Sequence, residues 1–506
     1  MCRPFLFSDW LKRSFSNNRF TQNLSALQSP QQNHGVEEMI KKLITGGTVA
    51  AFMLAPQVAS EDAHKGMPFG AKAFEIYKTA VEMKSTKQHG ETPKLARYLA
   101  AEFEKGGFPA QDIHVAEVAG TAVLIVRYRG DGSSGKKPIS ISAHMDVVEA
   151  NPEDWVRDPF TLIEEDGYFF GRGTADDKLG LTSVTANFLR LKSEGWVPNR
   201  DLILAFSGDE ETGMRSTRTL VNEFRSLTDS EFVLNADAGG ATLPLDGSAP
   251  ASFGMQAAEK TYASWEITVT NPGGHSSRPR DDNAIYELAE ALLKVRNYKF
   301  PVLYNDLTRT YFKGTGTKTS GDLGNAMVRF AEDPTDEWAI KILRADPSYV
   351  GTTGTTCVAT MLRGGHAQNA LPQSATATIN CRIFPGVGLT DTKADLERAI
   401  GNDAITFKSV YDSTETDPSP LRDDVLAALQ KAVDNKFPGL EIIPAMSSGG
   451  TDGKHFRAAG IPSYGVNGGY HRANDVNAHG LNERILVQTF YDNLAHWYVL
   501  LKAIAE

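Results

Sequence analysis

The sequence predicts an α/β protein with a central, mostly parallel mixed sheet, interrupted by an α+β segment with an antiparallel sheet. Over residues 72–261, runs typical of buried strands alternate with runs of helical spacing, the pattern of a parallel sheet covered by helices. Over residues 262–411, apolar and polar residues alternate, as in antiparallel strands with one face in water. The first pattern returns over residues 412–506. Because 506 residues exceed what one core usually serves, we expect one domain to be inserted into another.

The individual elements follow from local periodicity and from turn residues at their ends. In the first part, strands are predicted at residues 121–128, 138–148, 202–208 and 232–237, and helices at 91–107 and 178–195. In the inserted part, strands are predicted at residues 264–271, 357–364 and 375–383, and a helix at 283–295. The Gly- and Thr-rich stretches 314–325 and 351–356 are predicted to be long mobile loops. Helices at residues 421–437 and 482–506 complete the chain.

Composition and charge exclude some classes of function. Hydrophobic residues make up 41% of the chain and charged residues 23%, which is ordinary for a globular protein. The formal net charge is -10, and Lys and Arg do not cluster in the body of the chain. A nucleic-acid partner is therefore not expected.

Residues 39–60 have the layout of a secretory signal peptide: a methionine, Lys41 and Lys42, a short apolar run and then small residues. The apolar run at residues 43–55 is too short to span a membrane, and a buried helix is the alternative interpretation. Residues 1–38 have no periodic pattern, so we interpret them as a mis-assigned start or a disordered extension. We therefore expect an exported protein, periplasmic or secreted, without a membrane span.

The three cysteines are Cys2, Cys357 and Cys381, and Cys2 would be lost with the leader. This number predicts no disulfide framework and leaves no thiolate set for zinc. Any metal must therefore be held by His, Asp and Glu.

Acidic residues gather after successive predicted strands. His144 and Asp146 stand two positions apart, so their side chains point to the same face of the sheet. The other members of the set are Asp176, Asp177, Asp209, Glu210, Glu211 and Asp237. In an open α/β sheet the carboxyl ends of strands are where ligands bind, and so many carboxylates together require a cation. Although any one of these residues could belong to a solvated acidic rim, the set predicts a divalent metal site. Imidazole and carboxylate ligands suit zinc, with cobalt or manganese as substitutes.

Seven sequence motifs, in order over about residues 140–490, resemble the di-zinc exopeptidase and amidohydrolase family that includes aminoacylase, succinyl-diaminopimelate desuccinylase, glutamate carboxypeptidase and carnosine-type dipeptidases. They are HMDVV, GRGTADDK, SGDEETG, the acidic turn after VLNA, GGHSS, GGTDGKHF and NAHGLNERI. The resemblance implies a zinc-exopeptidase-like catalytic core in two parts, residues 72–261 and 412–506. It also implies an inserted lid or dimerisation domain at residues 262–411, through which the chain could form a homodimer.

The resemblance further implies the members of a centre with two Zn²⁺ per subunit. His144 and Asp237 would hold one ion, Glu211 and His479 the other, and Asp176 would bridge them. Asp146 would orient the His144 imidazole, Glu210 would be the general base, and the Asp176–Asp177 peptide bond would be cis. The last ligand has an alternative, because His471 is followed by Asn474 and Asp475, a near copy of the pattern that follows His479.

Five residues match substrate-contacting positions of the family. His275 in GGHSS would donate a hydrogen bond to the carbonyl oxygen of the substrate. Arg382 would bind a free carboxylate of the substrate with its planar guanidinium. Asn369 would contact the substrate from the inserted domain, and Gly450 and Thr451 from the core side.

Together these features predict a metallopeptidase that cleaves an amide bond next to a free carboxylate, with a water activated by two metal ions and Glu210. It would act as a carboxypeptidase or dipeptidase on small peptides. An N-acyl amino acid deacylase or a desuccinylase is the alternative within this class. Outside it, a non-catalytic binding protein on the same fold would be expected to lack the base or a ligand. A two-metal phosphoesterase would need an Arg/Lys cluster beside the acidic motifs, and the sequence has none there.

Overall fold

The computed structural model describes residues 67–473, 475 and 477–506. The predicted signal peptide at residues 39–60 and the segment before it lie outside the described residues. Within the described part, every helix is too short or too polar to cross a membrane.

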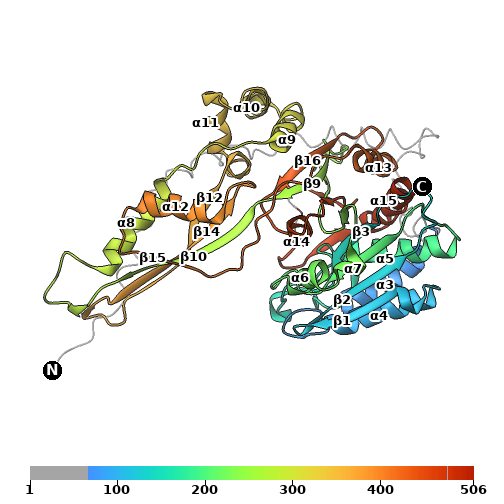
Figure 1. Cartoon of the computed structure of the whole chain (residues 1–506), viewed down its shortest axis with the longest axis horizontal. Coiled ribbons are helices and arrows are strands. Elements are labelled where there is room, and N and C mark those ends of the chain that lie inside the picture. The colour runs from blue at the N-terminus through green and yellow to red at the C-terminus, as the bar shows by residue number, and fades with distance from the viewer. Residues whose placement is uncertain (1–66, 474, 476) are drawn as a thin grey trace, which may run out of the picture. The chain divides into compact units, whose positions relative to one another are not determined.

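The core of the described chain is a ten-stranded mixed sheet (Figure 1). Its order is β1 (Ile113–Val118), β2 (Thr121–Tyr128), β6 (Leu202–Ser207), β3 (Ile139–His144), β7 (Val233–Asn235), β17 (Ser463–Gly465), β9 (Phe253–Glu259), β8 (Gly240–Leu243) and β18 (Tyr470–Arg472), with β16 (Ile442–Ser447) also paired to β9. The central strands β6, β3, β7 and β17 are parallel to one another, whereas β1 and β2 are antiparallel at one edge.

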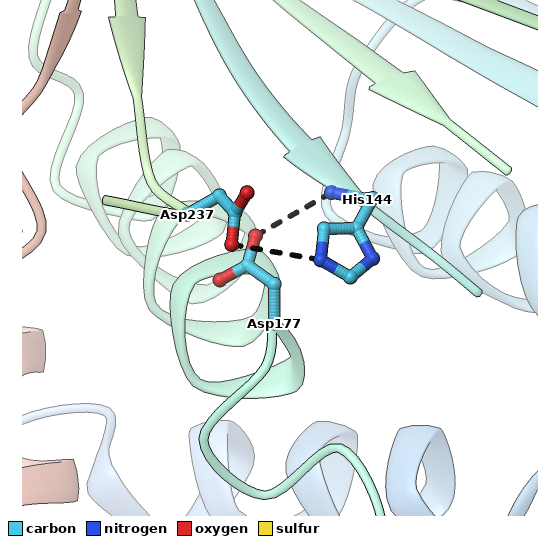
Figure 2. A group of neighbouring side chains, drawn as sticks. All are labelled: His144, Asp177 and Asp237. Atoms are coloured by element: carbon cyan, nitrogen blue, oxygen red, sulfur yellow. Dashed lines mark hydrogen bonds and ion pairs between the residues drawn. The ribbon is translucent and has the colours of Figure 1, made fainter. Parts of the chain in front are cut away.

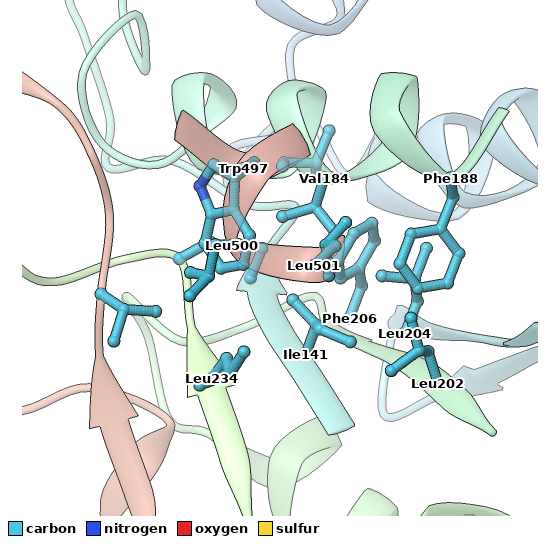
Figure 3. Close-up of a cluster of buried hydrophobic side chains, with 14 of the residues drawn as sticks. Ile141, Val184, Phe188, Leu202, Leu204, Phe206, Leu234, Trp497, Leu500 and Leu501 are labelled. Atoms are coloured by element: carbon cyan, nitrogen blue, oxygen red, sulfur yellow. The ribbon is translucent and has the colours of Figure 1, made fainter. Parts of the chain in front are cut away.

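Both faces of this sheet are buried because strand side chains alternate between two helical layers. Leu204 and Phe206 of β6 pack with α5 (Lys178–Ser193) and α15 (Val487–Ala505), as Figure 3 shows. Ile203 and Ala205, which alternate with them, belong to a second cluster with α6 (Arg215–Asn222) and α14 (Gly453–Ala458). The remaining helices of this part are α3 (Gly70–Glu82), α4 (Thr92–Lys105), α7 (Arg225–Thr228) and α13 (Asp423–Asp434).

A small antiparallel sheet ties the last part of the chain to the first. It comprises β4 (Ile163–Glu165), β5 (Tyr168–Phe170) and β19 (Arg484–Leu486). Short 3-10 helices are η1 (Ala110–Asp112), η2 (Pro152–Asp154) and η3 (Val350–Thr353).

A separate four-stranded antiparallel sheet has its own core. Its order is β12 (Thr356–Gly364), β14 (Ser374–Ile383), β10 (Thr261–Thr270) and β15 (Thr406–Ser409). Helix α8 (Ala284–Asn297) packs on this sheet and against α12 (Leu389–Ile400) (Figure 1). Beside it, β11 (Gly274–His275) and β13 (Ala370–Leu371) form a two-residue ribbon. The predicted fold class is therefore confirmed, and the exact domain boundaries stay a prediction.

The prediction of a long loop is wrong for residues 314–325 and only partly right for residues 351–356. Residues 314–325 lie in α9 (Asp306–Gly316), the turn after it and α10 (Gly321–Glu332), which precede α11 (Glu337–Ala345), and residues 351–356 enter η3 and β12. The glycines serve close packing here: a Cβ on Gly324 would stand 1.8 Å from the Thr319 carbonyl oxygen.

One disulfide forms although the sequence predicted no framework. Cys357 of β12 and Cys381 of β14 are 24 residues apart in the chain and are direct partners in the register of the two strands. Local sequence did not indicate this pairing, because it depends on which strands become neighbours.

Candidate active site

Three parallel strands bring the predicted polar residues to one edge of the main sheet. His144 is the last residue of β3 and pairs in register with Ser207 of β6, so the turn that carries Glu210 and Glu211 starts beside it. On the other side of β3, β7 ends at Asn235, two residues before Asp237. Asp176 lies two residues before the first residue of α5.

The side chains meet in two half-sites that share Asp176. His144 Nε2 lies 2.9 Å from Asp176 Oδ1 and 3.6 Å from Asp237 Oδ1. His479 Nε2 lies 2.8 Å from Glu211 Oε1 and 3.1 Å from Asp176 Oδ2. The two oxygens of Asp176 therefore face different imidazoles, an arrangement that suits a carboxylate shared between two cations.

Asp177 also reaches this centre. Figure 2 shows its carboxylate next to Asp237 and below His144, whose backbone N–H donates to Asp177 Oδ2 over 3.4 Å. Asp177 is fully buried, and its peptide bond to Asp176 is cis, as the resemblance implied. Asp177 belongs to the acidic set that predicts a metal site, but the family resemblance did not imply that it is a ligand, although its place in the DDK motif was a signal for one.

The donor atoms fit a metal. Among the described residues, three groups have donor atoms within 4.8 Å of one another. They are His144 with Asp177 and Asp237, His144 with Glu210 and Glu211, and Asp176 with Glu211 and His479. Such imidazole and carboxylate sets suit zinc, cobalt or manganese.

The raised pKa values of the centre also indicate that its carboxylates favour a bound positive charge. Hydrogen bonds to Asp176 and Glu211 raise the pKa of His479 to about 10. Burial lowers the pKa of His144, but the charge of Asp237 and hydrogen bonds to nearby carboxylates outweigh it and raise that pKa well above its usual range. Burial raises the pKa of Glu210 well above its usual range. The carboxylates thus keep protons on both imidazoles, and a divalent cation would replace those protons as it binds.

Asp146 holds the turn that carries the two glutamates. Its carboxylate accepts hydrogen bonds from the backbone N–H groups of Glu210, over 3.0 Å, and Glu211, over 3.1 Å. His144 Nδ1 lies nearer to the Asp146 backbone carbonyl, at 3.1 Å, than to its carboxylate, at 3.5 Å. The expected partner of the imidazole is thus present, but its carboxylate is directed mainly at the Glu210–Glu211 turn.

His471 lies apart from these groups. It belongs to β18, and its Nε2 lies 3.2 Å from Thr242 Oγ1. Of the two alternatives left open by the sequence, His479 contacts Asp176 and Glu211.

Arg382 joins the inserted sheet to the loop that contains Gly450 and Thr451. Its guanidinium donates to the Ser448 carbonyl oxygen over 2.7 Å and lies over the Tyr262 ring. The Thr451 N–H and hydroxyl both donate to the buried Glu259, over 3.0 and 2.5 Å. Three of the five predicted substrate residues are therefore close together: Gly450 and Thr451 lie in the loop after β16, and Arg382 contacts that loop at Ser448.

His275 and Asn369 are placed differently. Both are exposed at the β11–β13 ribbon, where Ser276 N–H donates to the Asn369 carbonyl oxygen over 3.0 Å and His275 Nδ1 lies 2.7 Å from Ser277 Oγ. Within the described residues, neither side chain forms a hydrogen bond or ion pair with the acidic centre.

Comparison with known proteins places these features in a family. The model of Peptidase family M20/M25/M40 matches residues 140–503. The N-fatty-acyl-amino acid synthase/hydrolase PM20D1 of Xenopus tropicalis is 29% identical over 382 residues, which cover 72% of each chain. The probable carboxypeptidase S-like 2 of Dictyostelium discoideum is 27% identical over 75% of this chain and 74% of its own.

A solved structure has the same fold. The M20 family metallo-carboxypeptidase Sso-CP2 of Sulfolobus solfataricus superposes with a TM-score of 0.65 at 19% identity. The match covers 86% of this chain and 99% of the other. With the family model matching well over half of the sequence, the predicted resemblance is confirmed, and the chain belongs to Peptidase family M20/M25/M40.

Proposed function

We propose that this protein is a zinc-dependent hydrolase that cleaves an amide bond next to a free carboxylate, as a carboxypeptidase or dipeptidase. The observation that carries the proposal is the position of Asp176, whose two oxygens lie 2.9 and 3.1 Å from the Nε2 atoms of two histidines. Each histidine has a further carboxylate beside it, so the centre has two similar halves. Membership of a peptidase family supports this chemistry.

Two metal ions would be held by residues that already face one another. His144 and Asp237 would hold one, Glu211 and His479 the other, and Asp176 would contact both; Asp177 is an additional donor on the first side. Bound zinc polarises a carbonyl and lowers the pKa of water, which makes amide hydrolysis possible at neutral pH.

The residues of the chain then have separate tasks. Glu210 takes a proton from the attacking water, whose oxygen adds to the carbonyl carbon, and delivers that proton to the nitrogen as the carbon–nitrogen bond breaks. His275 donates a hydrogen bond to the carbonyl oxygen as negative charge develops there. Arg382 pairs with the substrate carboxylate, and Asn369, Gly450 and Thr451 line its path.

A second candidate is hydrolysis of N-acyl amino acids. The relative at 29% identity is named an N-fatty-acyl-amino acid synthase/hydrolase, and such substrates also carry an amide next to a carboxylate. The same centre would serve, and the difference would lie in the surface that contacts the acyl group. A purely binding protein is less favoured because the centre has both the base and all the proposed ligands.

A homodimer through the inserted domain is part of the proposal. Edge strand β12 exposes Val358, Met361 and Leu362, and neighbouring α8 exposes Ile285 and Tyr286. An exposed apolar edge strand is open to pairing with a second strand, and a two-fold dimer would cover it.

Export is proposed from the sequence of residues 39–60 alone. N-terminal sequencing of the secreted protein tests it. A mature chain that begins before residue 40 would contradict the proposal.

The substrate proposal is tested by a panel assayed on the metal-free protein before and after zinc is added. The panel includes dipeptides, longer peptides, N-acyl amino acids and N-succinyl amino acids, each paired with a counterpart whose carboxylate is amidated. Phosphate esters are also included. We expect zinc-dependent release of an amino acid only from substrates with a free carboxylate. Hydrolysis of the phosphate esters alone, or no hydrolysis with zinc bound, would contradict the proposal.

A further inference from the structure

Glu483 is a fully buried carboxylate next to the candidate metal centre, and no step of the proposed reaction uses it. Its Oε1 accepts hydrogen bonds from the backbone N–H groups of Ala175, over 2.9 Å, and Asp176, over 3.1 Å. Its Oε2 accepts from the Gly173 N–H over 2.9 Å and from Arg172 Nη1 over 2.6 Å. One side chain thus receives four donors from the loop that ends at Asp176.

The same side chain is linked to the segment that carries His479. Arg172 is 3% exposed, and its other terminal nitrogen, Nη2, donates to the carbonyl oxygen of Gly480 over 3.0 Å. The backbone carbonyl of Glu483 also accepts from the Gly171 N–H over 3.1 Å. Two segments about 300 residues apart in sequence, one with Asp176 and one with His479, are therefore joined by the Glu483–Arg172 pair.

The other proposed ligands are held by different groups. Asp146 accepts from the N–H of Glu211, and the Asn235 side chain accepts from the N–H of Asp237 over 3.0 Å. Glu483 is therefore the buried acid whose contacts act on Asp176, the one ligand that both half-sites share. A change at Glu483 should disturb both half-sites together.

We infer that Glu483 is a positioning residue that holds Asp176 and the His479 segment in the arrangement needed to bind both metal ions. The inference rests on the proposed function, because it assumes that this centre binds metal. A glutamine at this position would keep the shape but would offer one acceptor oxygen and one NH₂ donor, so two of the four donors would lose their acceptor. Partners that support metal ligands typically change metal affinity 10- to 100-fold when they are altered.

The test is a cobalt(II) titration of the metal-free protein, followed by visible absorption. Wild-type protein should bind two equivalents, and Glu483→Gln should weaken both by about 10- to 100-fold. Glu211→Gln and Asp237→Asn, each of which removes a ligand from one half-site, should weaken mainly one equivalent. Glu483→Asp keeps the charge with a shorter reach and should give an intermediate loss.

Glu102→Gln is the matched control. Glu102 is another buried glutamate, 3% exposed, and its partners are Lys72 of α3 and Lys105 of α4 rather than the acidic centre. This variant measures the general effect of removing a buried charge and should leave the cobalt titration unchanged.

Each outcome has a distinct meaning. If Glu483→Gln lowers the thermal stability but leaves both cobalt affinities unchanged, Glu483 is only structural and the inference is overturned. Weakening of a single equivalent also overturns it, because the shared ligand would then not be the target. If the glutamine variant does not fold, the same criteria apply to Glu483→Asp. If wild-type protein binds no cobalt, the proposed function fails before the inference is reached.

Discussion

The acidic centre and the β11–β13 ribbon carry residues predicted for the same reaction, but they are built in opposite ways. In the centre, His144 is 1% exposed and Asp146 3% exposed, although His479 is exposed, and carboxylates accept from the backbone N–H groups of Glu210, Glu211 and Asp176. In the ribbon, His275 and Asn369 are exposed and form hydrogen bonds with neighbouring residues of the ribbon. The side chains of the centre already face one another in positions that could hold a metal ion. We expect the ribbon to take part in the proposed reaction only after it meets a substrate or another element.

The strongest way to test this contrast is to disable the base in the rigid centre. Glu210→Gln should lower turnover by about 10²- to 10⁴-fold, the range for a lost general base. Both metal ions should stay bound, because the proposed ligands are untouched. Turnover and zinc content are measured on the same preparation, and near-normal turnover would show that Glu210 is not the base.

The matching change in the ribbon is His275→Ala. If His275 stabilises the developing oxyanion, kcat should fall by about 10²- to 10³-fold with little change in zinc content. An unchanged kcat would remove His275 from the mechanism.

A mixture of His275→Ala and Glu210→Gln chains then distinguishes two ways in which the ribbon could reach the centre. Restored activity in the mixture means that one subunit supplies His275 to the other. No restoration means that the inserted domain closes on its own chain.

A smaller effect is expected at Arg382, where the inserted sheet contacts the Ser448 loop. Arg382→Lys keeps the charge but loses the planar fork, so KM should rise about 10- to 100-fold for substrates with a free carboxylate. Carboxylate-amidated analogues, measured as competitive inhibitors, provide the control, and their already weak binding should not change. An equal loss of affinity for both kinds of compound would mean that Arg382 acts through the Ser448 loop and does not bind the carboxylate.

The last expected effect is on stability rather than on turnover, and it concerns His496 of helix α15. Burial lowers the pKa of His496 to about 4, and its Nε2 lies 2.9 Å from the Val466 carbonyl oxygen. Because the unfolded chain binds this proton more readily, stability is present above about pH 6.5 and falls by about 3 kcal/mol as the pH drops to about 4. His496→Gln, which keeps a donor but does not titrate, should flatten the pH dependence of the free energy of unfolding in this range. Parallel curves for the two proteins would contradict this assignment.

Much of the rigid centre could be predicted from sequence, and the reason is physical. Strand ends and acidic motifs are local features, and parallel strands bring their carboxyl ends together whatever the details of packing. The supporting contacts were not predictable in this way. Glu483 meets Asp176 across 307 positions of the chain, and the carboxylate of Asp146 is directed at backbone N–H groups that no side-chain pattern reveals.

The inserted part of the chain was harder to predict, because its local patterns depend on distant neighbours. Glycines in residues 314–325 suggested mobility, but Gly316 and Gly324 allow the turn between α9 and α10 to pack closely. Whether a glycine serves flexibility or close approach depends on neighbours that are distant in the sequence. The pairing of Cys357 with Cys381 had the same dependence on strand order.

The central claim is that the centre at the end of the main sheet binds two metal ions through two half-sites that share Asp176. Its most direct test is the zinc content per chain after equilibrium dialysis of the metal-free protein, for wild type, Glu210→Gln and Glu211→Gln in parallel. We predict two ions for wild type and for Glu210→Gln, and weakened binding of one ion for Glu211→Gln, partly restored by excess zinc. A wild-type protein that binds fewer than two ions, or loss of zinc in Glu210→Gln instead of Glu211→Gln, would contradict the claim.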